Sequence, residues 1–300
     1  MAIDILLVNP VFLSQDDSER ELGSPYFPLG LLYLAAFLRE RGRRVGIFDG
    51  TFSNGLDDFQ AALREHDPRA VGITAVQPSR ATTLRLAEAA HDYGATVILG
   101  GPDPTYTPQT YLANPAVDLV VHHEGEITLD ELLDTLLRES SLNEHLSQID
   151  GIAYRGANGE RVVNPRRPYI LNLDELPFPA RDLIDIQQYL NFWRERNGYA
   201  SLSISVARGC PYGCKWCQDS VHGQDFRQRS PQNVAAEVKA LMETYQIDRL
   251  RVVDDVDGIP LEWFETWEEA AEEQGGGLPF EALYQVERQD VPMMDIRDIL

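Results

Sequence analysis

Short apolar segments alternate with amphipathic segments along the first part of the chain. The apolar segments have the length of buried strands, and they are Ile3–Val8, Val45–Phe48, Ala70–Val76, Thr96–Leu99 and Val117–Val121. The segments between and after them repeat apolar residues at helical spacing, and they are Pro28–Arg41, Leu56–His66, Ala81–Tyr93 and Leu129–Leu137. Strands buried on both faces of a parallel sheet are apolar throughout. The alternation therefore predicts an α/β domain over residues 1–142, with helices on both faces of a doubly wound sheet.

The pattern changes after residue 142 and then resumes. Residues 149–164 read as a hairpin around Ala157-Asn158-Gly159, and Pro165–Tyr199 reads as a packed linker, which makes 143–200 a connecting region. A second strand–helix series follows over 201–300. Its predicted elements are a strand at Leu202–Val206, a helix at Pro231–Tyr245 capped by Ser230, a strand at Arg249–Val253, a helix at Leu261–Glu273 and a strand at Phe280–Val286.

Composition narrows the class of protein. The chain of 300 residues is 43% hydrophobic and 25% charged, with a formal net charge of −22. Such an acidic chain is not expected to bind nucleic acid, because phosphate contacts need clustered Lys and Arg. The longest apolar stretch, Tyr26–Leu38, is too short to span a bilayer, so no membrane segment is predicted. Three closely spaced cysteines do not suit a disulfide framework, which predicts a reducing, cytoplasmic setting.

The residues that follow the predicted strands form the first candidate site. Ligands of doubly wound sheets bind at the carboxyl ends of the strands, near the point where the strand order reverses. These ends carry Asn9-Pro10, Asp49-Gly50, Thr74-Ala75-Val76, Gly100-Gly101-Pro102 and His122-His123-Glu124-Gly125-Glu126. The dinucleotide fingerprint G-x-G-x-x-G is absent, which argues against a nicotinamide enzyme.

The three cysteines of the chain form the second candidate site. Cys210, Cys214 and Cys217 have the spacing C-x-x-x-C-x-x-C and follow the strand at Leu202–Val206 directly. Three thiolates could hold a zinc ion with His222 as the fourth ligand. They could instead hold an iron–sulfur cube with one iron left open to a further ligand. Gly209 allows a tight loop around such a cube.

This motif resembles the signature of the radical S-adenosylmethionine superfamily. The surrounding stretches, RGCPYGC…WC, GQDFRQRSPQNVAAEV, LDELPFPARDLID and GGPDPTYTP, resemble the subgroup that has an N-terminal cobalamin-binding domain. The resemblance covers nearly the whole chain. It implies a flavodoxin-like, Rossmann-like cobalamin-binding domain followed by the first half of a radical S-adenosylmethionine (β/α) barrel.

The resemblance also implies a mechanism and a set of ligands. Cys210, Cys214 and Cys217 would hold a [4Fe–4S] cluster that cleaves S-adenosylmethionine to a 5′-deoxyadenosyl radical. Trp216, Asp254 and Asp255 would contact S-adenosylmethionine. The simpler alternatives are packing for Trp216 and a helix cap for the aspartate pair. A flavodoxin or ferredoxin would supply electrons.

Cobalamin would lie on the first domain, at Asn9, Thr74, Gly100, Gly101, Glu124 and Gly125. The match to cobalamin-binding domains is incomplete, because no D-x-H-x-x-G motif is present and His123 stands where relatives tend to have glycine. Any bound cobalamin would therefore lack a histidine ligand from that motif. The alternative is a scaffold that no longer binds cobalamin. His122 and His123 are either functional or ordinary packed histidines.

The length of residues 201–300 indicates how much of the family's barrel this sequence contains. The family's barrel has about six strand–helix units, and roughly 30 residues per unit leaves room for three between Leu202 and Leu300. We therefore expect a fragment of a longer protein. The expected function is a radical enzyme that methylates a small molecule or closes a ring with the help of cobalamin. The alternative is a non-catalytic module that binds zinc or a cluster structurally.

Overall fold

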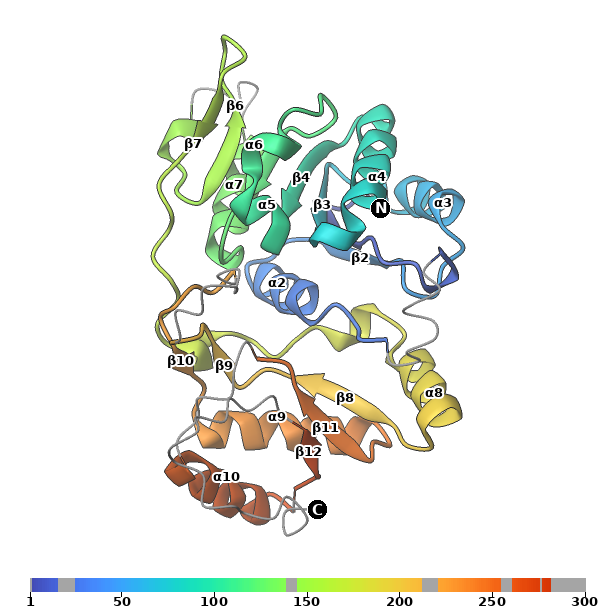
Figure 1. Ribbon diagram of the computed structural model, residues 1–300, viewed down its shortest axis with the longest axis vertical. Coiled ribbons are helices and arrows are strands. Elements are labelled where there is room, and N and C mark those ends of the chain that lie inside the picture. Colours follow the sequence, from blue (N-terminus) through green and yellow to red (C-terminus); the bar gives the residue numbers. More distant parts are fainter. Residues whose placement is uncertain are drawn as a thin grey trace. The chain divides into compact units, whose positions relative to one another are not determined.

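The computed structural model describes residues 2–15, 25–138, 145–211, 221–254, 261–275 and 277–281. The described residues belong to two compact units (Figure 1). The first unit takes residues 1–170 and 176–186, and the second takes residues 171–175 and 187–300. Among the described residues, no helix is long and apolar enough to cross a bilayer.

The first unit is built on one seven-stranded sheet. Its strands are β1 (Ile5–Asn9), β2 (Val45–Asp49), β3 (Ala70–Thr74), β4 (Thr96–Gly100), β5 (Leu119–Val121), β6 (Ile152–Arg155) and β7 (Arg161–Val163). They lie in the order β2-β1-β3-β4-β5-β6-β7. The first five strands pair in parallel, which confirms the predicted α/β fold class. The strand order reverses beside β1, so the edge near β1 and β3 is where such folds bind ligands.

Helices cover both faces of this sheet. The long helices of the unit are α2 (Leu29–Glu40), α3 (Leu56–His66), α4 (Arg80–Tyr93) and α7 (Glu126–Arg138), and the short ones are α5 (Pro102–Tyr106) and α6 (Pro108–Tyr111). Single turns of 3-10 helix lie at Leu13–Gln15, Gln77–Ser79, Leu146–Gln148 and Arg181–Leu183. Helix α4 ends at Gly94, which is in the left-handed conformation, as its place after the amphipathic segment predicts.

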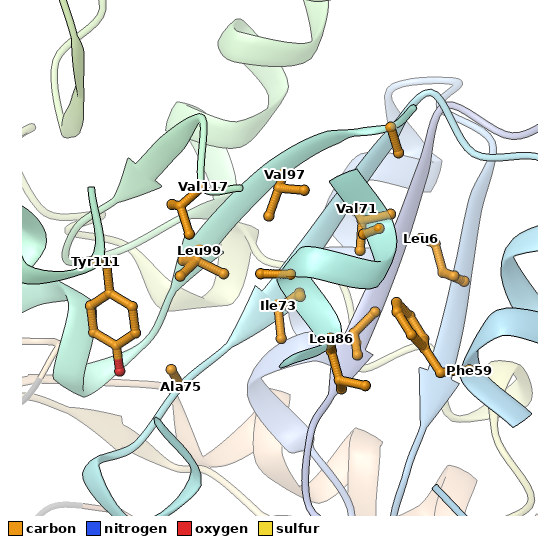
Figure 2. Close-up of a cluster of buried hydrophobic side chains, with 14 of the residues drawn as sticks. Leu6, Phe59, Val71, Ile73, Ala75, Leu86, Val97, Leu99, Tyr111 and Val117 are labelled. Atoms are coloured by element: carbon orange, nitrogen blue, oxygen red, sulfur yellow. The ribbon is translucent and has the colours of Figure 1, made fainter. Parts of the chain in front are cut away.

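Alternation along each strand explains why two cores form. In β1, Leu6 and Val8 join one buried cluster, which contains side chains from α3 and α4 (Figure 2). Ile5 and Leu7 join the other cluster, which contains side chains from α2 and α7. All four are at most 1% exposed. Burying a side chain of this size contributes about 1.5–3 kcal/mol, so the double-sided burial of the strands holds the layers together.

The hairpin predicted over 149–164 is present, but it is part of the sheet. Strand β6 pairs antiparallel with β5, and β7 pairs antiparallel with β6. Residues that the sequence pattern assigns to a connecting region thus extend the first unit. Helix α7 also begins at Glu126, three residues before its predicted start at Leu129. The helices α5 and α6 were not predicted, because the proline-rich stretch that forms them lacks helical periodicity.

The second unit contains a three-stranded parallel sheet in the order β12-β11-β8. Its strands are β8 (Ser201–Ile204), β11 (Arg249–Val252) and β12 (Phe280–Glu281). Helices α9 (Pro231–Thr244) and α10 (Leu261–Glu273) follow β8 and β11, and α8 (Ile186–Asn197) precedes β8. A turn of 3-10 helix lies at Leu173–Glu175. The Ser230 hydroxyl accepts from the backbone N–H of Asn233 at 3.2 Å, so Ser230 is the predicted cap of α9.

Two elements of this unit lie outside the predictions. Helix α8 occupies part of Pro165–Tyr199, the predicted linker, and buries Tyr189, Leu190 and Trp193. A two-residue ribbon pairs β9 (Ala207–Arg208) with β10 (Arg227–Gln228) in antiparallel fashion. The ribbon joins the two ends of the segment that carries the cysteines.

Candidate functional site

The ribbon of β9 and β10 places the first cysteine of the motif. Cys210 is the second residue after β9, and its backbone N–H donates to the carbonyl oxygen of Gly223 at 3.0 Å. Its thiol is free and half-buried. Cys214, Cys217, Trp216 and Asp255 lie outside the described residues. The structure therefore defines the start of the cysteine loop and the point to which its far end returns.

Gly209 makes the turn between β9 and Cys210. Its φ is +82°, a conformation that side chains with a Cβ rarely adopt. A Cβ built there would lie 2.5 Å from the carbonyl oxygen of Asp225 and 3.1 Å from that of Gly223. Any other residue at position 209 would prevent this close approach of the two ends of the loop, so glycine is required there.

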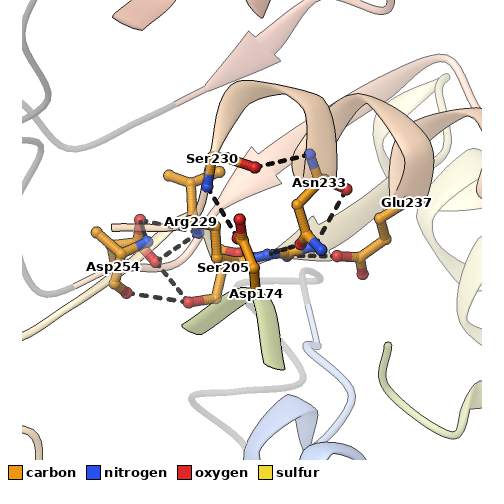
Figure 3. Close-up of polar contacts among 9 residues, drawn as sticks. Asp174, Ser205, Arg229, Ser230, Asn233, Glu237 and Asp254 are labelled. Atoms are coloured by element: carbon orange, nitrogen blue, oxygen red, sulfur yellow. Dashed lines mark hydrogen bonds and ion pairs between the residues drawn. The ribbon is translucent and has the colours of Figure 1, made fainter. Parts of the chain in front are cut away.

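Asp254 connects the end of β11 to the segment that precedes the cysteines (Figure 3). One carboxylate oxygen accepts from the Ser205 hydroxyl at 2.8 Å, and the other accepts from the Ala207 N–H at 2.8 Å. The N–H of Val206 lies 3.1 Å from both oxygens. The carboxylate thus holds three consecutive residues. Whether it also contacts S-adenosylmethionine stays a prediction.

Arg229, the residue that follows β10, holds the same segment. Its guanidinium donates to the Ser205 carbonyl oxygen at 2.8 Å and to the carboxylate of Glu237 (Figure 3). The side chains of Arg229 and Glu237 are 5% and 2% exposed. The guanidinium also donates to the Asn233 side chain at 2.7 Å. Because the two charges are buried together, removing either member of the pair would leave an uncompensated charge.

Sequence reasoning missed this network, although a signal is present. Arg229, Asn233 and Glu237 stand four residues apart, which places the last two on one face of α9. Glu237 is 1% exposed, on a helix face that otherwise buries Val234, Val238 and Leu241. A glutamate at a core position of an amphipathic helix indicates a buried cation nearby, and Arg229 supplies it.

In the first unit, Asn9 ends β1 and ties it to β2. Its side-chain amide donates to the Asp49 carboxylate at 2.9 Å and to the Thr51 hydroxyl at 3.1 Å. The Thr51 hydroxyl in turn donates to Asp49 at 2.8 Å. Asn9 is 6% exposed. The predicted cobalamin contact is therefore a buried residue that fixes the edge next to the switch point.

Thr74, Gly100 and Gly101 meet at the ends of β3 and β4. Gly101 has a φ of +99°, and a Cβ there would lie 2.8 Å from the Thr74 hydroxyl oxygen. The Ala75 N–H donates to the Gly100 carbonyl oxygen at 2.8 Å. A Cβ at Gly100 would meet one atom within 4 Å, the Val121 carbonyl oxygen at 3.6 Å. Three predicted residues are thus brought together, and a Cβ could be accommodated at Gly100 but not at Gly101.

An ion pair missed by the sequence analysis braces these two strand ends. The buried Asp103 carboxylate accepts two hydrogen bonds from Arg80, at 2.7 and 2.8 Å. It also accepts from the Tyr111 hydroxyl at 2.6 Å. The Arg80 guanidinium lowers the pKa of Asp103, and burial raises the pKa of Tyr111 so that its hydroxyl remains a donor. The signal was Asp103 itself, an acidic residue inside the apolar-flanked stretch GGPDPTYTP.

The loop after β5 carries the remaining predicted residues. Glu124 is 7% exposed and accepts from the Ile170 N–H at 2.8 Å. Gly125 faces the Leu34 side chain, which a Cβ would approach to 3.2 Å. His123 has a φ of +63°, the left-handed conformation that glycine adopts freely, and its ring packs against His122 and Tyr169. The residue that replaces the expected glycine therefore keeps a glycine-like backbone.

The donor sets fit the two groups that the sequence motifs imply. A half-buried free thiol at a glycine turn suits a cluster ligand. Gly100, where a Cβ would make an ordinary contact with one carbonyl oxygen, lies at the carboxyl edge of a parallel sheet, which suits a cobalamin contact. Residues 10–28, which connect β1 to α2, contain no histidine, so they offer cobalamin no histidine ligand.

Comparison with known proteins identifies a domain family and several relatives that this chain is similar to. The B12 binding domain family matches residues 20–133. An uncharacterized methyltransferase of Pyrococcus horikoshii is 34% identical over 256 residues, which are 84% of this chain and 53% of that protein. The anaerobic magnesium-protoporphyrin IX monomethyl ester cyclase of Rubrivivax gelatinosus is 26% identical over 84% of this chain and 45% of its own length. The chain thus spans about half the length of these curated relatives.

A solved structure has the same fold. It is the cobalamin-dependent S-adenosylmethionine radical enzyme OxsB with aqua-cobalamin and S-adenosylmethionine bound. Its TM-score to this chain is 0.74, at 19% identity, over 93% of this chain and 38% of that one.

Proposed function

Because this chain belongs to the radical S-adenosylmethionine proteins that carry a B12-binding domain, we propose that it acts in cobalamin-dependent methyl transfer to a small molecule. The observation that carries the proposal is the cysteine loop, whose three-cysteine motif begins at a turn already closed by β9 and β10. The methyltransferase from Pyrococcus horikoshii supports methyl transfer as the reaction.

The residues of this chain would divide the work between the two units. Cys210, Cys214 and Cys217 would supply three thiolates, and Trp216, Asp254 and Asp255 would contact S-adenosylmethionine. The cobalamin contacts would be Asn9, Thr74, Gly100, Gly101, Glu124 and Gly125. When bound, the [4Fe–4S] cluster supplies an electron for the cleavage of S-adenosylmethionine and cobalamin supplies a carrier for the methyl group.

The second unit supports a radical S-adenosylmethionine barrel begun by residues 201–300. Its strands β8, β11 and β12 are parallel and adjacent in chain order. Each of the helices α9 and α10 connects one strand to the next. In a (β/α) barrel, the strand of each strand–helix unit lies beside the strand of the preceding unit. In a doubly wound sheet, the strand order reverses.

The proposed radical chemistry also indicates an electron donor and a cellular compartment. The electron would come from a flavodoxin or ferredoxin. Thiolates that must stay reduced to hold iron require a reducing compartment, so we assign the protein to the cytoplasm. The acidic charge supports a small-molecule substrate over a nucleic acid.

Ring closure is the second candidate reaction. The observation that favours it is the similarity to the cyclase of Rubrivivax gelatinosus, which covers as much of this chain as the methyltransferase does. Both candidates require the same metal content, and they differ in whether a methyl group appears in the product.

Metal analysis tests the proposal. The full chain is reconstituted anaerobically with iron and sulfide, exposed to hydroxocobalamin, desalted, and analysed for iron, zinc and cobalt. We expect about four irons and one cobalt per chain. Cys214→Ala serves as the control and should lose the iron while keeping the cobalt.

Other outcomes would redirect the proposal. Iron without cobalt would leave a radical enzyme whose first unit is a scaffold. Zinc that is lost in Cys214→Ala would contradict catalysis and support a structural metal module. Where cobalamin binds, the electron paramagnetic resonance spectrum of its cobalt(II) form should lack coupling to a histidine nitrogen.

A further inference from the structure

The chain between β8 and the first cysteine is held residue by residue. Asp254 and Arg229 form hydrogen bonds with Ser205 and Val206, and Asp254 also binds Ala207. In the ribbon, Ala207 pairs with Gln228 and Arg208 pairs with Arg227. Cys210 forms a hydrogen bond with Gly223. Gly209, between Arg208 and Cys210, leaves no room for a Cβ, which would lie 2.5 Å from the Asp225 carbonyl oxygen. The position of Cys210 is therefore set by protein contacts that exist without a metal.

We propose that Asp254 is a positioning residue, whose carboxylate holds the Ser205 hydroxyl and the backbone N–H groups of Val206 and Ala207 and thereby determines where Cys210 presents its thiolate. The inference rests on the proposed function, since it assigns Asp254 a role toward the cluster. It differs from the predicted contact between Asp254 and S-adenosylmethionine, because the carboxylate acts here through the protein backbone.

The end of the sheet explains why a carboxylate is needed. Strands β8 and β11 pair up to Ile204 and Val252, and the Val253 N–H still donates to the Ile204 carbonyl oxygen at 3.0 Å. Beyond that point the chain turns from the sheet into the ribbon. The N–H groups of Val206 and Ala207 then donate to the Asp254 carboxylate, because the pairing of β8 with β11 ends at Ile204.

An aspartate meets this need and an asparagine does not. Both carboxylate oxygens accept, one from a hydroxyl and an N–H and the other from two N–H groups. An amide at the same place would direct its own NH₂ group at one of these donors. Asp254→Asn thus removes the charge and one of the two accepting oxygens, with almost no change in side-chain volume.

The second anchor predicts that the variant still folds. Arg229 donates to the Ser205 carbonyl oxygen at 2.8 Å, and the backbone N–H of Arg229 donates to the Val206 carbonyl oxygen at 2.8 Å. These bonds do not involve Asp254. Loss of the carboxylate should therefore shift the segment and leave the unit folded.

The chain offers a matched control at the opposite end of the same strands. Asp248 precedes β11, and its carboxylate accepts from the Ala200 N–H at 2.7 Å, just before β8. Asp248→Asn thus removes the same charge from a carboxylate that also holds a backbone N–H. It does so at the amino end of β8, whereas the cysteines follow its carboxyl end.

Hydrogen exchange of the metal-free full chain is the first measurement. In Asp254→Asn, we expect faster exchange of the amides of Val206, Ala207 and Cys210 than in the unchanged protein. Asp248→Asn should leave these amides unchanged. Unchanged exchange at Cys210 in Asp254→Asn would overturn the proposal. If Asp254→Asn does not fold, Ser205→Ala removes one donor to the carboxylate and should accelerate the same amides to a smaller extent.

Electron paramagnetic resonance of the reduced, iron-loaded protein is the second measurement. We expect Asp254→Asn to bind iron with an altered cluster spectrum before S-adenosylmethionine is added, and to need about tenfold more S-adenosylmethionine for half-saturation. An unaltered spectrum with weakened S-adenosylmethionine binding would overturn positioning in favour of direct contact. A failure of the unchanged protein to bind iron would contradict the proposed function, while the exchange measurement still tests the role of Asp254.

Discussion

His123 shows how one residue can adopt the backbone of another. Its φ of +63° costs a side chain with a Cβ about 1 kcal/mol relative to glycine. The N–H of His123 donates to the Thr105 hydroxyl at 3.0 Å, and its ring packs against Tyr169 at a centroid distance of 6.0 Å. These contacts offset the cost, and they orient the ring within the first unit.

Gly209 provides a residue-scale prediction. Gly209→Ala would combine an unfavourable φ with a Cβ 2.5 Å from a carbonyl oxygen, so the ribbon or the cysteine turn must shift. We expect the variant to retain less than half of the iron of the unchanged protein after reconstitution, since one displaced thiolate weakens the cluster. Gly94→Ala is the control, because Gly94 has a φ of +96° and open space around its Cβ position.

Comparison of Gly209→Ala with Gly94→Ala separates the effect of steric crowding around the Cβ from the effect of the positive φ. Gly94→Ala should cost about 1 kcal/mol of unfolding free energy and leave iron content unchanged. Equal iron content in Gly209→Ala and the unchanged protein would show that the closeness of the loop ends is not needed for metal binding.

His122 provides a second prediction, about pH. Burial lowers the pKa of His122, and the neighbouring His123 lowers it further. Among the described residues, its Nε2 has no hydrogen-bond partner. Its folded-state pKa lies below the unfolded value of about 6.5, so the stability it contributes is complete above that pH and is lost as the pH falls below it.

The measurement is urea unfolding between about pH 5.5 and 8. The unfolding free energy should decrease toward the acid end, by about 1.4 kcal/mol for each unit that separates the two pKa values. His122→Asn should flatten this dependence. A curve that is equally steep in the variant would assign it to another group.

At the scale of elements, local patterns were predicted and long-range pairings were not. The parallel strands and amphipathic helices carry their periodicity in their own residues, as α3 does over Leu56–His66, where predicted and observed bounds agree. The ribbon of β9 and β10 has two residues in each strand and depends on contacts across the cysteine segment. No periodicity can reveal so short a pairing.

The same distinction applies to the candidate sites. Cys210 and the glycine pair at Gly100 stood out because each belongs to a short local motif that directly follows a predicted strand. Asp103 and Arg229 did not, because their importance depends on partners that are distant in sequence or buried by tertiary packing. Arg80 and Asp103 are 23 residues apart and meet only when β3 and β4 pair.

Asp103 yields a prediction at this scale, because it couples α4 to α5. Asp103→Asn would leave Arg80 without its carboxylate and bring an NH₂ group toward the Tyr111 donor. We expect a loss of about 1–3 kcal/mol in unfolding free energy by urea titration. Cobalamin binding, followed by absorbance, should also weaken, since the pair braces the loops of Thr74 and Gly101.

The control removes the same charge from an exposed site. Asp92→Asn lies on the solvent side of α4 and should change stability by less than about 0.5 kcal/mol. The pKa of Asp103 is lowered chiefly by its hydrogen bonds to Arg80, so its contribution is present above about pH 4 and lost as the pH falls through its folded value. Equal stability of the two variants would contradict the bracing role.

At the scale of the whole molecule, charge dominates the surface. The chain has 26 Lys and Arg against 48 Asp and Glu, which gives the formal net charge of −22. Ion pairs place some of the cations next to carboxylates, and among the described pairs Arg43 binds both Asp130 and Asp134. The remaining repulsion favours expansion of the chain.

Salt should therefore stabilise the protein. Raising KCl from about 20 to 300 mM shortens the screening length from roughly 20 to 6 Å and weakens the repulsion. We expect the thermal midpoint to rise by about 2–4 °C for each kcal/mol gained. Differential scanning calorimetry measures this shift, and an equal concentration of neutral osmolyte controls for water activity. A midpoint that falls with salt would show that the surface ion pairs outweigh the excess negative charge.

The β6–β7 hairpin influences how the first sheet is assembled. Its strands are joined directly through residues 156–160, whereas β4 and β5 pair across α5 and α6. Hairpins form within about 1–10 μs, and parallel pairs wait for longer segments to close. The hairpin can thus offer a ready edge to β5, which has three residues. We expect its turn residues to govern how fast the native state is reached more than how slowly it is lost.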